Sequence, residues 1–193
     1  FGGLDQRLTI TYAGRNGTVY GPSTTPPTNA GDYTASATYP GDANHTGSGN
    51  SKDFRITRAS QSITFATPSA TPAPRYTYGT DSVFTVGGTA TSNLAVGFAS
   101  TTTDVCTVDG TTVAILGAGD CTIVASQDGD SNYEAATAVP RTFTVAKAAS
   151  ATTVTAPDAA YTGSPYTGAS ASATGFGGLD QRLTITYAGR NGT

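Results

Sequence analysis

The sequence repeats one long segment without a single change. Residues 1–18 and residues 176–193 both read FGGLDQRLTITYAGRNGT. A chance match of that length is not credible, so the chain contains one full period, residues 1–175, and residues 176–193 begin the next. Periodicity of this kind indicates a tandem array, and it restricts the fold to units that can be joined end to end along one chain.

A weaker repeat lies inside the period. Residues 54–59 (FRITRA) and 143–148 (FTVAKA) share the pattern F-x-[IV]-x-[RK]-A at an offset of 89 positions. Residues 41–45 (GDANH) and 129–133 (GDSNY) match at an offset of 88 positions. The period therefore consists of two related units, which we name type A and type B.

The two repeats predict the domain boundaries. Residues 59–147 are expected to form a complete type B domain, residues 1–58 the later part of a type A domain, and residues 148–193 the early part of the next type A domain. Joining residues 148–193 to residues 19–58 rebuilds a full type A unit, whose length agrees with what the period leaves beside type B. The array thus reads A-B-A-B.

The composition predicts strands rather than helices. Glu134 is the only glutamate, and Lys52 and Lys147 are the only lysines, whereas helix surfaces are normally rich in both residue types. Residues 8–12 (LTITY) and 33–39 (YTASATY) alternate with period two, the pattern of a sheet with one buried and one solvated face. Turn signals recur at short intervals, so the lengths of both units suit all-β, Ig-like β-sandwich domains in an extended tandem array.

Type B contains the only two cysteines of the chain, Cys106 and Cys121. Residues 104–108 and 112–116 are expected to pair as a hairpin around a turn at residues 109–110, and Cys121 lies in the strand that follows. The two cysteines thus sit in strands that could lie close together. In an exported protein the simplest interpretation is one disulfide. A metal site would need further ligands, which the sequence does not offer nearby.

These motifs resemble known repeats. In type A, residues 8–12 (LTITY), 28–34 (TNAGDYT) and 37–45 (ATYPGDANH) resemble the MBG-type repeats of bacterial surface proteins. In type B, the segments SITF, TDVCTV, GDCTIVASQ, GDSNY and FTVAKA are similar to the related bacterial Ig-like repeats. Together these motifs cover essentially the whole chain. The resemblance implies an all-β fold, a secreted or cell-surface location, and a place in the stalk of a giant adhesin or extracellular fibre protein.

Asp128, Asp130 and Asn132 have a spacing that could serve a Ca²⁺ loop, and they are the candidate metal ligands. The alternative is a turn in which Asp and Asn side chains bond to the backbone between two strands. Type A has Pro40 where type B has Asp128, so the first ligand would be missing there. The turn is the favoured interpretation, and neither a metal nor a cofactor is expected.

His45 is the only histidine, and a catalytic interpretation would make it a general base. The equivalent position in type B is Tyr133, which indicates an aromatic ring packed beside a turn. No Ser-His-Asp or Cys-His arrangement can be assembled around this one residue. We therefore expect that the chain is not an enzyme.

Asn16, Asn44 and Asn191 fit the N-glycosylation sequon and are candidate glycosylation sites, although the motif is frequent by chance in a chain rich in Thr and Asn. The net charge is −3 and basic residues are sparse and scattered, so no nucleic-acid partner is expected. No run of about 18 apolar residues exists, so no membrane insertion is expected in this segment.

The leading functional expectation is a structural spacer, a repeat segment of an extracellular stalk or fibre that projects adhesive parts from a cell surface. Neither domain boundary has a Gly/Ser-rich linker, so neighbouring domains are expected to touch and the array to be semi-rigid. The expected partners are the neighbouring repeats of the same chain, with other copies of the fibre or surface glycans as further candidates.

Two alternatives belong to other functional classes. One is an adhesin module that itself binds glycans or matrix, which the concentration of tyrosines in type A would support. The other is a subunit of a filament in which the half-domains of different chains complete each other, as in donor-strand exchange. The two copies of the repeated segment would then compete for one place, which favours the spacer.

Overall fold

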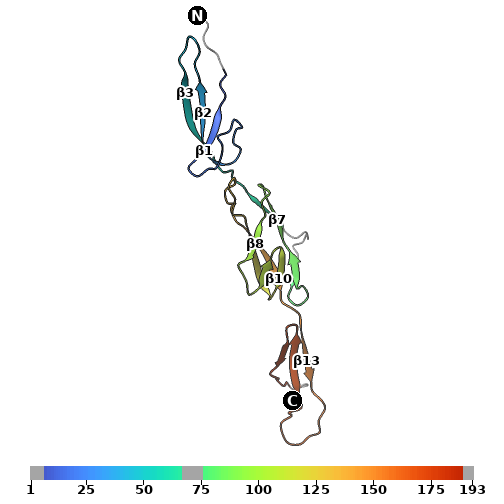
Figure 1. Ribbon diagram of the computed structural model, residues 1–193. Helices are drawn as coiled ribbons and strands as arrows, with labels where there is room; N and C mark the ends of the chain where they lie inside the picture. Colours follow the sequence, from blue (N-terminus) through green and yellow to red (C-terminus); the bar gives the residue numbers. More distant parts are fainter. Residues whose placement is uncertain (1–6, 67–75, 189–193) are drawn as a thin grey trace. The chain divides into compact units, whose positions relative to one another are not determined.

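The computed structural model describes residues 7–66 and 76–188, and every regular element in these two ranges is a β-strand (Figure 1). The prediction of an all-β chain is therefore confirmed. No helix in the same ranges is long and apolar enough to cross a membrane.

Two compact units make up the described chain. The first consists of the described residues up to Thr64 together with Thr89–Val96 and Ser126–Ala138. The second consists of the described residues of Phe65–Gly88, of Gly97–Ala125 and of the chain from Val139 onward. The domain boundaries inferred from the repeats, after residues 58 and 147, stay predictions.

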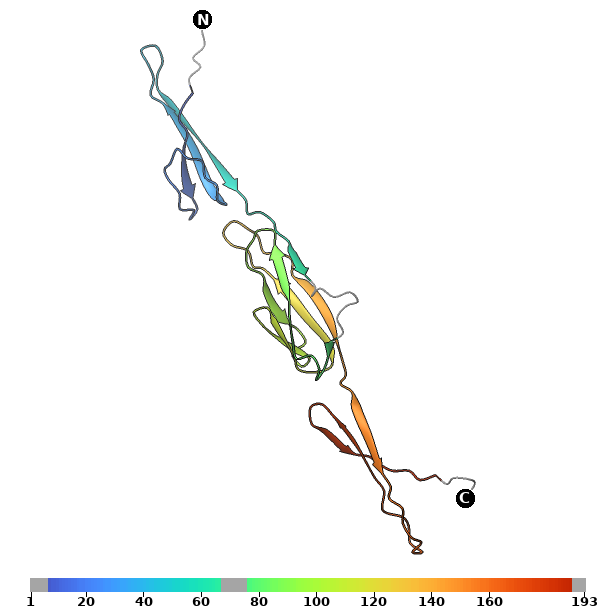
Figure 2. The ribbon, with the colours of Figure 1, turned by 90° about the vertical axis from the view of Figure 1, so that its right-hand side faces the viewer.

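The first unit contains an antiparallel sheet with the strand order β1-β2-β3 (Figure 2). Its strands are β1 (Thr11–Arg15), β2 (Gly31–Tyr39) and β3 (Ser48–Ile56). Tyr33 of β2 lies opposite Phe54 of β3, and the two rings stack with their centroids 5.4 Å apart. Tyr33 is only 1% exposed, and its hydroxyl donates a hydrogen bond to the Asn29 carbonyl at 2.8 Å. Aromatic stacking between neighbouring strands thus provides the core of this sheet.

The strand predicted at residues 8–12 begins later than expected. β1 starts at Thr11, and Leu8 is 40% exposed. In the second copy of the repeated segment, Leu183 is the counterpart of Leu8, and its N–H donates to the Ala171 carbonyl of a different sheet. The two copies of LTITY therefore make different backbone contacts: Thr11 and Tyr12 of the first copy pair with β2, and Leu183 of the second copy bonds to Ala171.

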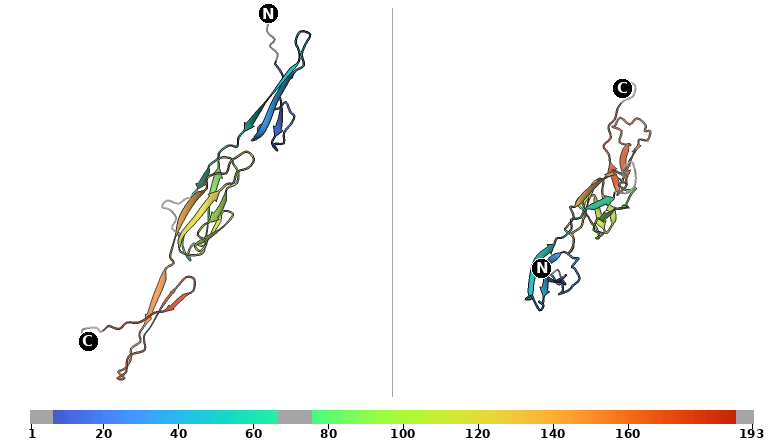
Figure 3. Two further views of the ribbon diagram at one scale, coloured as in Figure 1. Left: turned by 90° about the vertical axis from the view of Figure 1, so that its left-hand side faces the viewer. Right: turned by 90° about the horizontal axis from the view of Figure 1, so that it is seen from above.

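The second unit contains two sheets in a β-sandwich-like arrangement, with the strand orders β5-β12-β11-β8 and β6-β10-β9 (Figure 3). The seven strands are β5 (Tyr76–Thr77), β6 (Val83–Thr85), β8 (Gly97–Ser100), β9 (Cys106–Asp109), β10 (Thr112–Ile115), β11 (Gly119–Ser126) and β12 (Val139–Ala146). A further two-stranded sheet pairs β4 (Ile63–Ala66) with β7 (Gly87–Ala90).

Aromatic rings from both sheets meet in the core of the sandwich. The ring of Phe84 on β6 stacks on Tyr76 of β5, with centroids 4.1 Å apart, and lies 5.1 Å from Phe143 of β12. Along β11, alternate side chains point inward, and Ile123 and Ala125 are both 0% exposed. This burial at every second position is the period-two pattern expected of a strand with one face on a core.

The hairpin predicted in type B forms, but its turn is one residue further along the chain. Thr112 pairs with Asp109, so the two turn residues are Gly110 and Thr111 rather than residues 109–110. Gly110 has a φ of +58° at the first turn position, where a type II′ turn places glycine. Val113, which is fully buried, lies on the core face of β10.

The last part of the described chain forms an antiparallel sheet with the order β13-β14-β15. Its strands are β13 (Ser150–Thr155), β14 (Ser170–Gly175) and β15 (Leu179–Arg182). No residue between 146 and 188 is buried, whereas the buried hydrophobic residues of the described chain, apart from Tyr33 and Tyr39, all lie between residues 63 and 145. A single sheet without a second layer cannot bury its apolar face, so this segment has no core of its own.

Candidate functional site

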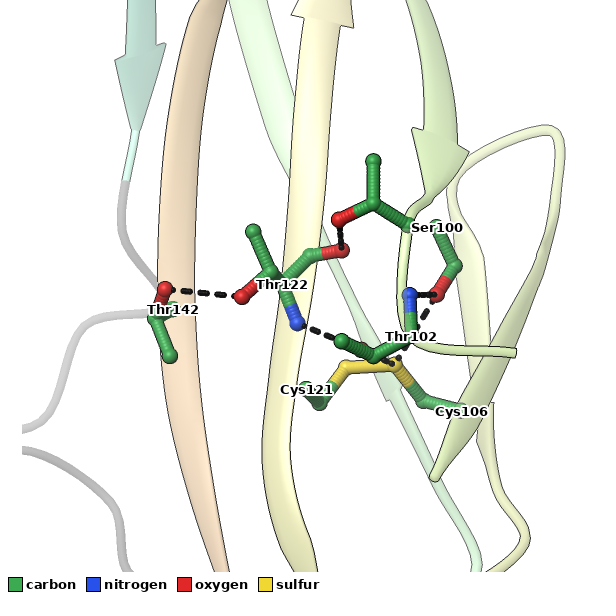
Figure 4. The surroundings of a disulfide bond; sticks show 7 residues. Ser100, Thr102, Cys106, Cys121, Thr122 and Thr142 are labelled. Carbon is green, nitrogen blue, oxygen red and sulfur yellow. Dashed lines mark hydrogen bonds between the residues drawn. A yellow bond between two sulfur atoms is a disulfide. The ribbon is translucent and has the colours of Figure 1, made fainter. Parts of the chain in front are cut away.

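The disulfide links the two sheets of the sandwich. Cys106 of β9 and Cys121 of β11 are bonded to each other, as the sequence predicted, and both are 0% exposed. Beside them, Thr102 Oγ1 accepts a hydrogen bond from the Thr122 N–H at 2.9 Å, and Ser100 Oγ lies 3.4 Å from the Cys106 sulfur (Figure 4). Disulfides persist in non-reducing environments, so the bond indicates such an environment for this chain. Because the sulfurs are bonded to each other, they are not metal ligands.

The carboxylate of Asp130 is used by its own turn. Its Oδ1 accepts hydrogen bonds from the backbone N–H groups of Asn132 at 2.7 Å and Tyr133 at 2.8 Å. The Asp130 N–H in turn donates to the Tyr133 carbonyl at 3.1 Å. This is the side-chain-to-backbone pattern of an Asx turn, in which the carboxylate replaces a backbone acceptor.

Two of the three candidate Ca²⁺ ligands have other partners. Asp130 Oδ1 accepts hydrogen bonds from its own turn, and the side-chain amide of Asn132 bonds to the Ala30 N–H and to Asn29 Oδ1. Within residues 7–66 and 76–188, no group of three or more His, Cys, Asp or Glu side chains is placed to hold a metal ion. The geometry of these residues is that of a turn.

Type A contains the same turn, bond for bond. Asp42 Oδ1 accepts hydrogen bonds from the N–H groups of Asn44 and His45, both at 2.8 Å, and the Asp42 N–H donates to the His45 carbonyl at 3.0 Å. Both turns begin with a glycine at positive φ, +92° for Gly41 and +78° for Gly129. A Cβ on Gly129 would collide with a backbone oxygen, so a larger residue does not fit. The match between GDANH and GDSNY is therefore a match of structure as well as of sequence.

His45 folds back on this turn. Its Nδ1 lies 2.9 Å from Asp42 Oδ1, and the Tyr39 hydroxyl donates to Asp42 Oδ2 at 2.7 Å. The Tyr39 hydrogen bond, with the Asn44 N–H and the His45 side chain, lowers the pKa of Asp42 from 3.8 to about 2. The same hydrogen bond to Asp42, together with burial, raises the pKa of the Tyr39 hydroxyl. The acidic group next to the only histidine thus stabilises the turn.

A second low-pKa carboxylate lies at the start of β2. Arg55 Nε and Nη2 donate to the two oxygens of Asp32 at 2.6 and 3.1 Å, and Asn16 Nδ2 donates to Oδ2 at 3.2 Å. The hydrogen bond from Arg55, followed by that from Asn16, lowers the pKa of Asp32 from 3.8 to about 2. Paired donors of this kind hold two strands in register, because a fork of N–H groups fixes the carboxylate plane.

The candidate glycosylation sites lie in different settings. Asn16 is exposed in the turn after β1, but its amide nitrogen donates to Asp32. Asn44 is exposed within the type A turn. Asn191 lies outside the described residues.

The Asn132 side chain joins type B to type A within the first unit. Its Oδ1 accepts a hydrogen bond from the Ala30 N–H at 2.9 Å, and its Nδ2 donates to Asn29 Oδ1 at 3.3 Å. The backbone of the same turn also bonds to the linker, because the Ala59 N–H donates to the Asn132 carbonyl at 2.8 Å and the Glu134 N–H donates to the Ala59 carbonyl at 2.9 Å. Ala59, at the predicted boundary between type A and type B, therefore bonds to this turn through both its N–H and its carbonyl.

Sequence reasoning did not identify Asn132 as a junction residue. It treated this asparagine only as a candidate metal ligand or a turn residue. The sequence contains one indication of this role. Both turns have Asn at the equivalent position, although the hydrogen bonds within each turn use only the backbone N–H of that Asn. A side chain retained without a role in its own turn indicates a partner elsewhere.

An open cavity of about 640 Å³ lies in the first unit, beside others. Its lining includes Asn16, Tyr20, Pro26, Tyr33 and Ser131. The two tyrosines are the only titratable groups in this lining, so it offers hydroxyl and amide contacts but no acid–base pair.

No protein-family model, curated protein or solved structure matches this chain. Its function is therefore inferred from the repeats, the burial pattern and the contacts described above.

Proposed function

We propose that this chain is a structural repeat segment of a long extracellular stalk or fibre, which spaces adhesive parts away from a cell surface. Its units are tandem Ig-like β-sandwich domains of the MBG type and the related bacterial Ig-like type. Such a segment has no catalytic role, and its partners are the neighbouring repeats of the same chain.

The observation that carries this proposal is that the two copies of the repeated segment pair with different sheets. In the second copy, β15 pairs with β14, and the Leu183 N–H donates to the Ala171 carbonyl at 3.0 Å. In the first copy, β1 comes later in the segment and pairs with β2. Overlaid by sequence, the two copies describe one strand that begins beside β14 and ends beside β2. A strand that changes sheets in this way is a feature of two-layered β-domains.

A complete type A domain then consists of the sheet β13-β14-β15 covered by a sheet equivalent to β1-β2-β3. The repeated tyrosine supports this reconstruction. Tyr12 packs edge-on against Phe54 with ring centroids 6.2 Å apart, whereas its counterpart Tyr187 is 64% exposed. Val154 and Phe176 are also 65% and 57% exposed. In a tandem chain the following residues would cover these apolar groups, and their burial would stabilise the domain.

The junction and the disulfide fit an exported stalk. A spacer keeps its two ends apart only if its domains are joined without flexible linkers. Here the N–H of Ala59 bonds to the Asn132 carbonyl, and the Ala59 carbonyl accepts from the Glu134 N–H. The Cys106–Cys121 bond stabilises type B without a ligand or cofactor. Both features serve mechanical continuity and durability outside the cell.

A filament of separate subunits is a second candidate, and the exposed apolar groups of the β13-β14-β15 sheet favour it equally. There, the residues 19–58 of another chain would supply the missing sheet. Both copies of the repeated segment would compete for the same position, however, so a continuous chain explains the duplication more simply.

The third candidate, a glycan-binding module, is supported less. Tyr33 and Tyr39 are buried and used by the core, and Tyr20 packs edge-on against Tyr33 with centroids 5.7 Å apart. Tyr161 is 97% exposed and is the clearest ring left for a ligand. A glycan array probed with the 193-residue chain and its Tyr161→Ala variant tests this candidate.

The spacer role is tested by removing whole periods from the native protein and measuring its contour length by electron microscopy. Each domain contributes roughly 40 Å, as expected from strands of about seven residues with their loops and linkers. Deletion of one period should therefore shorten the filament by roughly 80 Å while leaving its attachment unchanged. If adhesion instead falls in proportion to the number of deleted periods, while each remaining period keeps its contour length, the repeats themselves bind the ligand and the binding module is favoured.

A further inference from the structure

We infer that the type A turn at residues 41–45 is a docking surface for the type B domain that precedes it in the array. In this joint, the side-chain oxygen of Asn44 accepts a hydrogen bond from the backbone N–H of Ala118. The inference rests on the proposed tandem arrangement, because it requires a type A domain to follow a complete type B domain.

The joint between type A and type B supplies the template. There, the Oδ1 of Asn132, held in its turn by Asp130, accepts from the Ala30 N–H at 2.9 Å. Ala30 is half-buried in a bend just before β2 begins at Gly31. The contact therefore joins the turn of one domain to the bend that precedes a strand in the domain before it.

Both halves of this contact recur with the roles of the domains exchanged. Asn44 occupies the position of Asn132 in a turn with the same hydrogen bonds. Residues 29–32 (NAGD) precede β2 as residues 117–120 (GAGD) precede β11, at the same offset that relates the two turns. Ala118 is half-buried in a bend before Gly119, as Ala30 is before Gly31.

The linker recurs as well. Ala59 ends the FRITRA segment and exchanges backbone hydrogen bonds with the type B turn. Ala148 ends the equivalent FTVAKA segment after β12. In the proposed joint, Ala148 takes the place of Ala59 and lies against the turn that contains Asn44.

The end of the type B sheet next to Ala118 already contacts the following type A segment. Val145 pairs with Gly119 on one side and with Tyr76 on the other, so the bend at Ala118 and strand β5 lie at the same end of the sheet. At that end, the ring of Tyr78 lies 5.1 Å from Phe176, edge to face. The following domain is thus in contact at this end of the sheet before its own turn is added.

The two joints differ in one bond. Asn132 Nδ2 also donates to Asn29, but the residue equivalent to Asn29 in type B is Gly117, which has no side chain. The joint from type B to type A therefore has the hydrogen bond from the Ala118 N–H to the Asn44 side chain, but no hydrogen bond between two side-chain amides. The array alternates between a stronger and a weaker joint.

The test compares the 193-residue chain with a two-period chain, in which residues 19–193 are appended after residue 193. Amide hydrogen exchange of the first Ala118 is measured by NMR in both. A hydrogen bond of ordinary strength should slow this exchange about fivefold to tenfold in the two-period chain. Ala30, whose bond to Asn132 is present in both chains, is the internal reference.

Matched variants assign the effect to one side chain. Asn44→Ala in the second period should return Ala118 to the exchange rate of the 193-residue chain, and Asn44→Asp there should not, because it keeps the acceptor oxygen. The same Asn44→Ala change in the first period should leave Ala118 unaffected, since no type B domain precedes that copy in the two-period chain.

Equal exchange of Ala118 in the two chains, with Ala30 protected in both, would overturn the joint while leaving the stalk proposal intact. An unprotected Ala30 in both chains would overturn it as well, because the template itself would be wrong. A native protein of a single period would overturn the stalk proposal and leave the exchange result on the two-period chain unaffected.

Discussion

The side-chain oxygen of Asn132 accepts a hydrogen bond from the backbone N–H of Ala30, a residue 102 positions earlier in the chain. The bond connects an Asx turn of type B with the start of a strand in type A, across the boundary that the internal repeat predicts. It is charge-neutral and short-ranged, so it acts locally at the junction rather than steering association. A junction of this kind suits a chain whose use depends on the continuity of its domains.

Loss of the Asn132 side chain should loosen this junction without unfolding either side. In Asn132→Ala, the Ala30 N–H should exchange about fivefold faster, since one hydrogen bond of ordinary strength is removed. The Ala59 N–H, which bonds to the Asn132 backbone carbonyl, should keep its rate. Asn132→Asp retains the acceptor and serves as the control. Faster exchange of Ala30 in Asn132→Asp as well would mean that the side-chain oxygen is not the acceptor.

Removal of the disulfide should destabilise type B selectively. The bond closes a loop with a sequence separation of 15 residues. On the chain-entropy account, the double change Cys106→Ala and Cys121→Ala should lower the free energy of unfolding by about 3 kcal/mol. Urea titration followed by the far-UV signal measures this difference. An unchanged midpoint in urea, at an unchanged slope, would contradict the stabilising role of the bond.

Tyr33 should be the most sensitive position of the first sheet. It is 1% exposed and stacks on Phe54, so Tyr33→Ala should cost about 3–5 kcal/mol of stability. Tyr33→Phe keeps the packing and loses only the hydroxyl bond to the Asn29 carbonyl, which should cost about 1 kcal/mol. Tyr161→Ala, at a residue 97% exposed, is the matched control and should change stability by less than about 0.5 kcal/mol. Equal losses for Tyr33→Ala and Tyr161→Ala would refute this account.

Acid should destabilise the first sheet and the type A turn over a defined range. The pKa values of Asp32 and Asp42 are lowered from 3.8 to about 2 by Arg55 and by Tyr39, respectively, as the main donors. Because both pKa values are lower in the folded chain, their contribution is complete above pH 3.8 and is lost as the pH falls through about 2. Melting temperatures measured from pH 5 downward should fall less steeply in the Asp32→Asn, Asp42→Asn double variant. A slope identical to that of the parent chain would show that these carboxylates are not the acid-sensitive groups.

Gly79 should be required for the contact between Tyr78 and Phe176. Its φ is +87°, and a Cβ added there would collide with the ring of Phe176. Gly110, at a φ of +58° with no atom within 4 Å of an added Cβ, is the matched control. Both changes to Ala should cost about 1–2 kcal/mol for the backbone conformation. Only Gly79→Ala should also abolish the NMR cross-peaks between the rings of Tyr78 and Phe176, and their persistence would contradict the geometry.

The sequence predicted the features that depend on local pattern. Period-two alternation identified the strand around Tyr33, because pleat geometry suffices for it. The disulfide was predicted because Cys106 and Cys121 are the only cysteines and lie in strands that could approach each other. The turn chemistry of Asp42 and Asp130 was also predicted, since Asx turns are local in sequence. These parts need no knowledge of distant contacts.

Features that depend on distant partners were not predicted correctly. Alternation in LTITY predicted one strand at residues 8–12, but β1 starts at Thr11, and Leu183, the counterpart of Leu8 in the second copy, bonds to a different sheet. The hairpin turn was placed one residue early, because Asp109-Gly110 and Gly110-Thr111 fit different turn types that the sequence alone does not separate. The Asn132 junction depends on a partner far away in the chain, for which a single sequence offers only the repeated asparagine as a signal.

The central claim is that the period of residues 1–175 belongs to one continuous polypeptide, and the length of the native chain tests it most directly. A denaturing gel under reducing conditions, or the gene read beyond both ends of this sequence, supplies that length. The account predicts a chain that contains many copies of this period. A native chain of about 19.3 kDa would contradict it and would mean that separate subunits complete each other's half-domains.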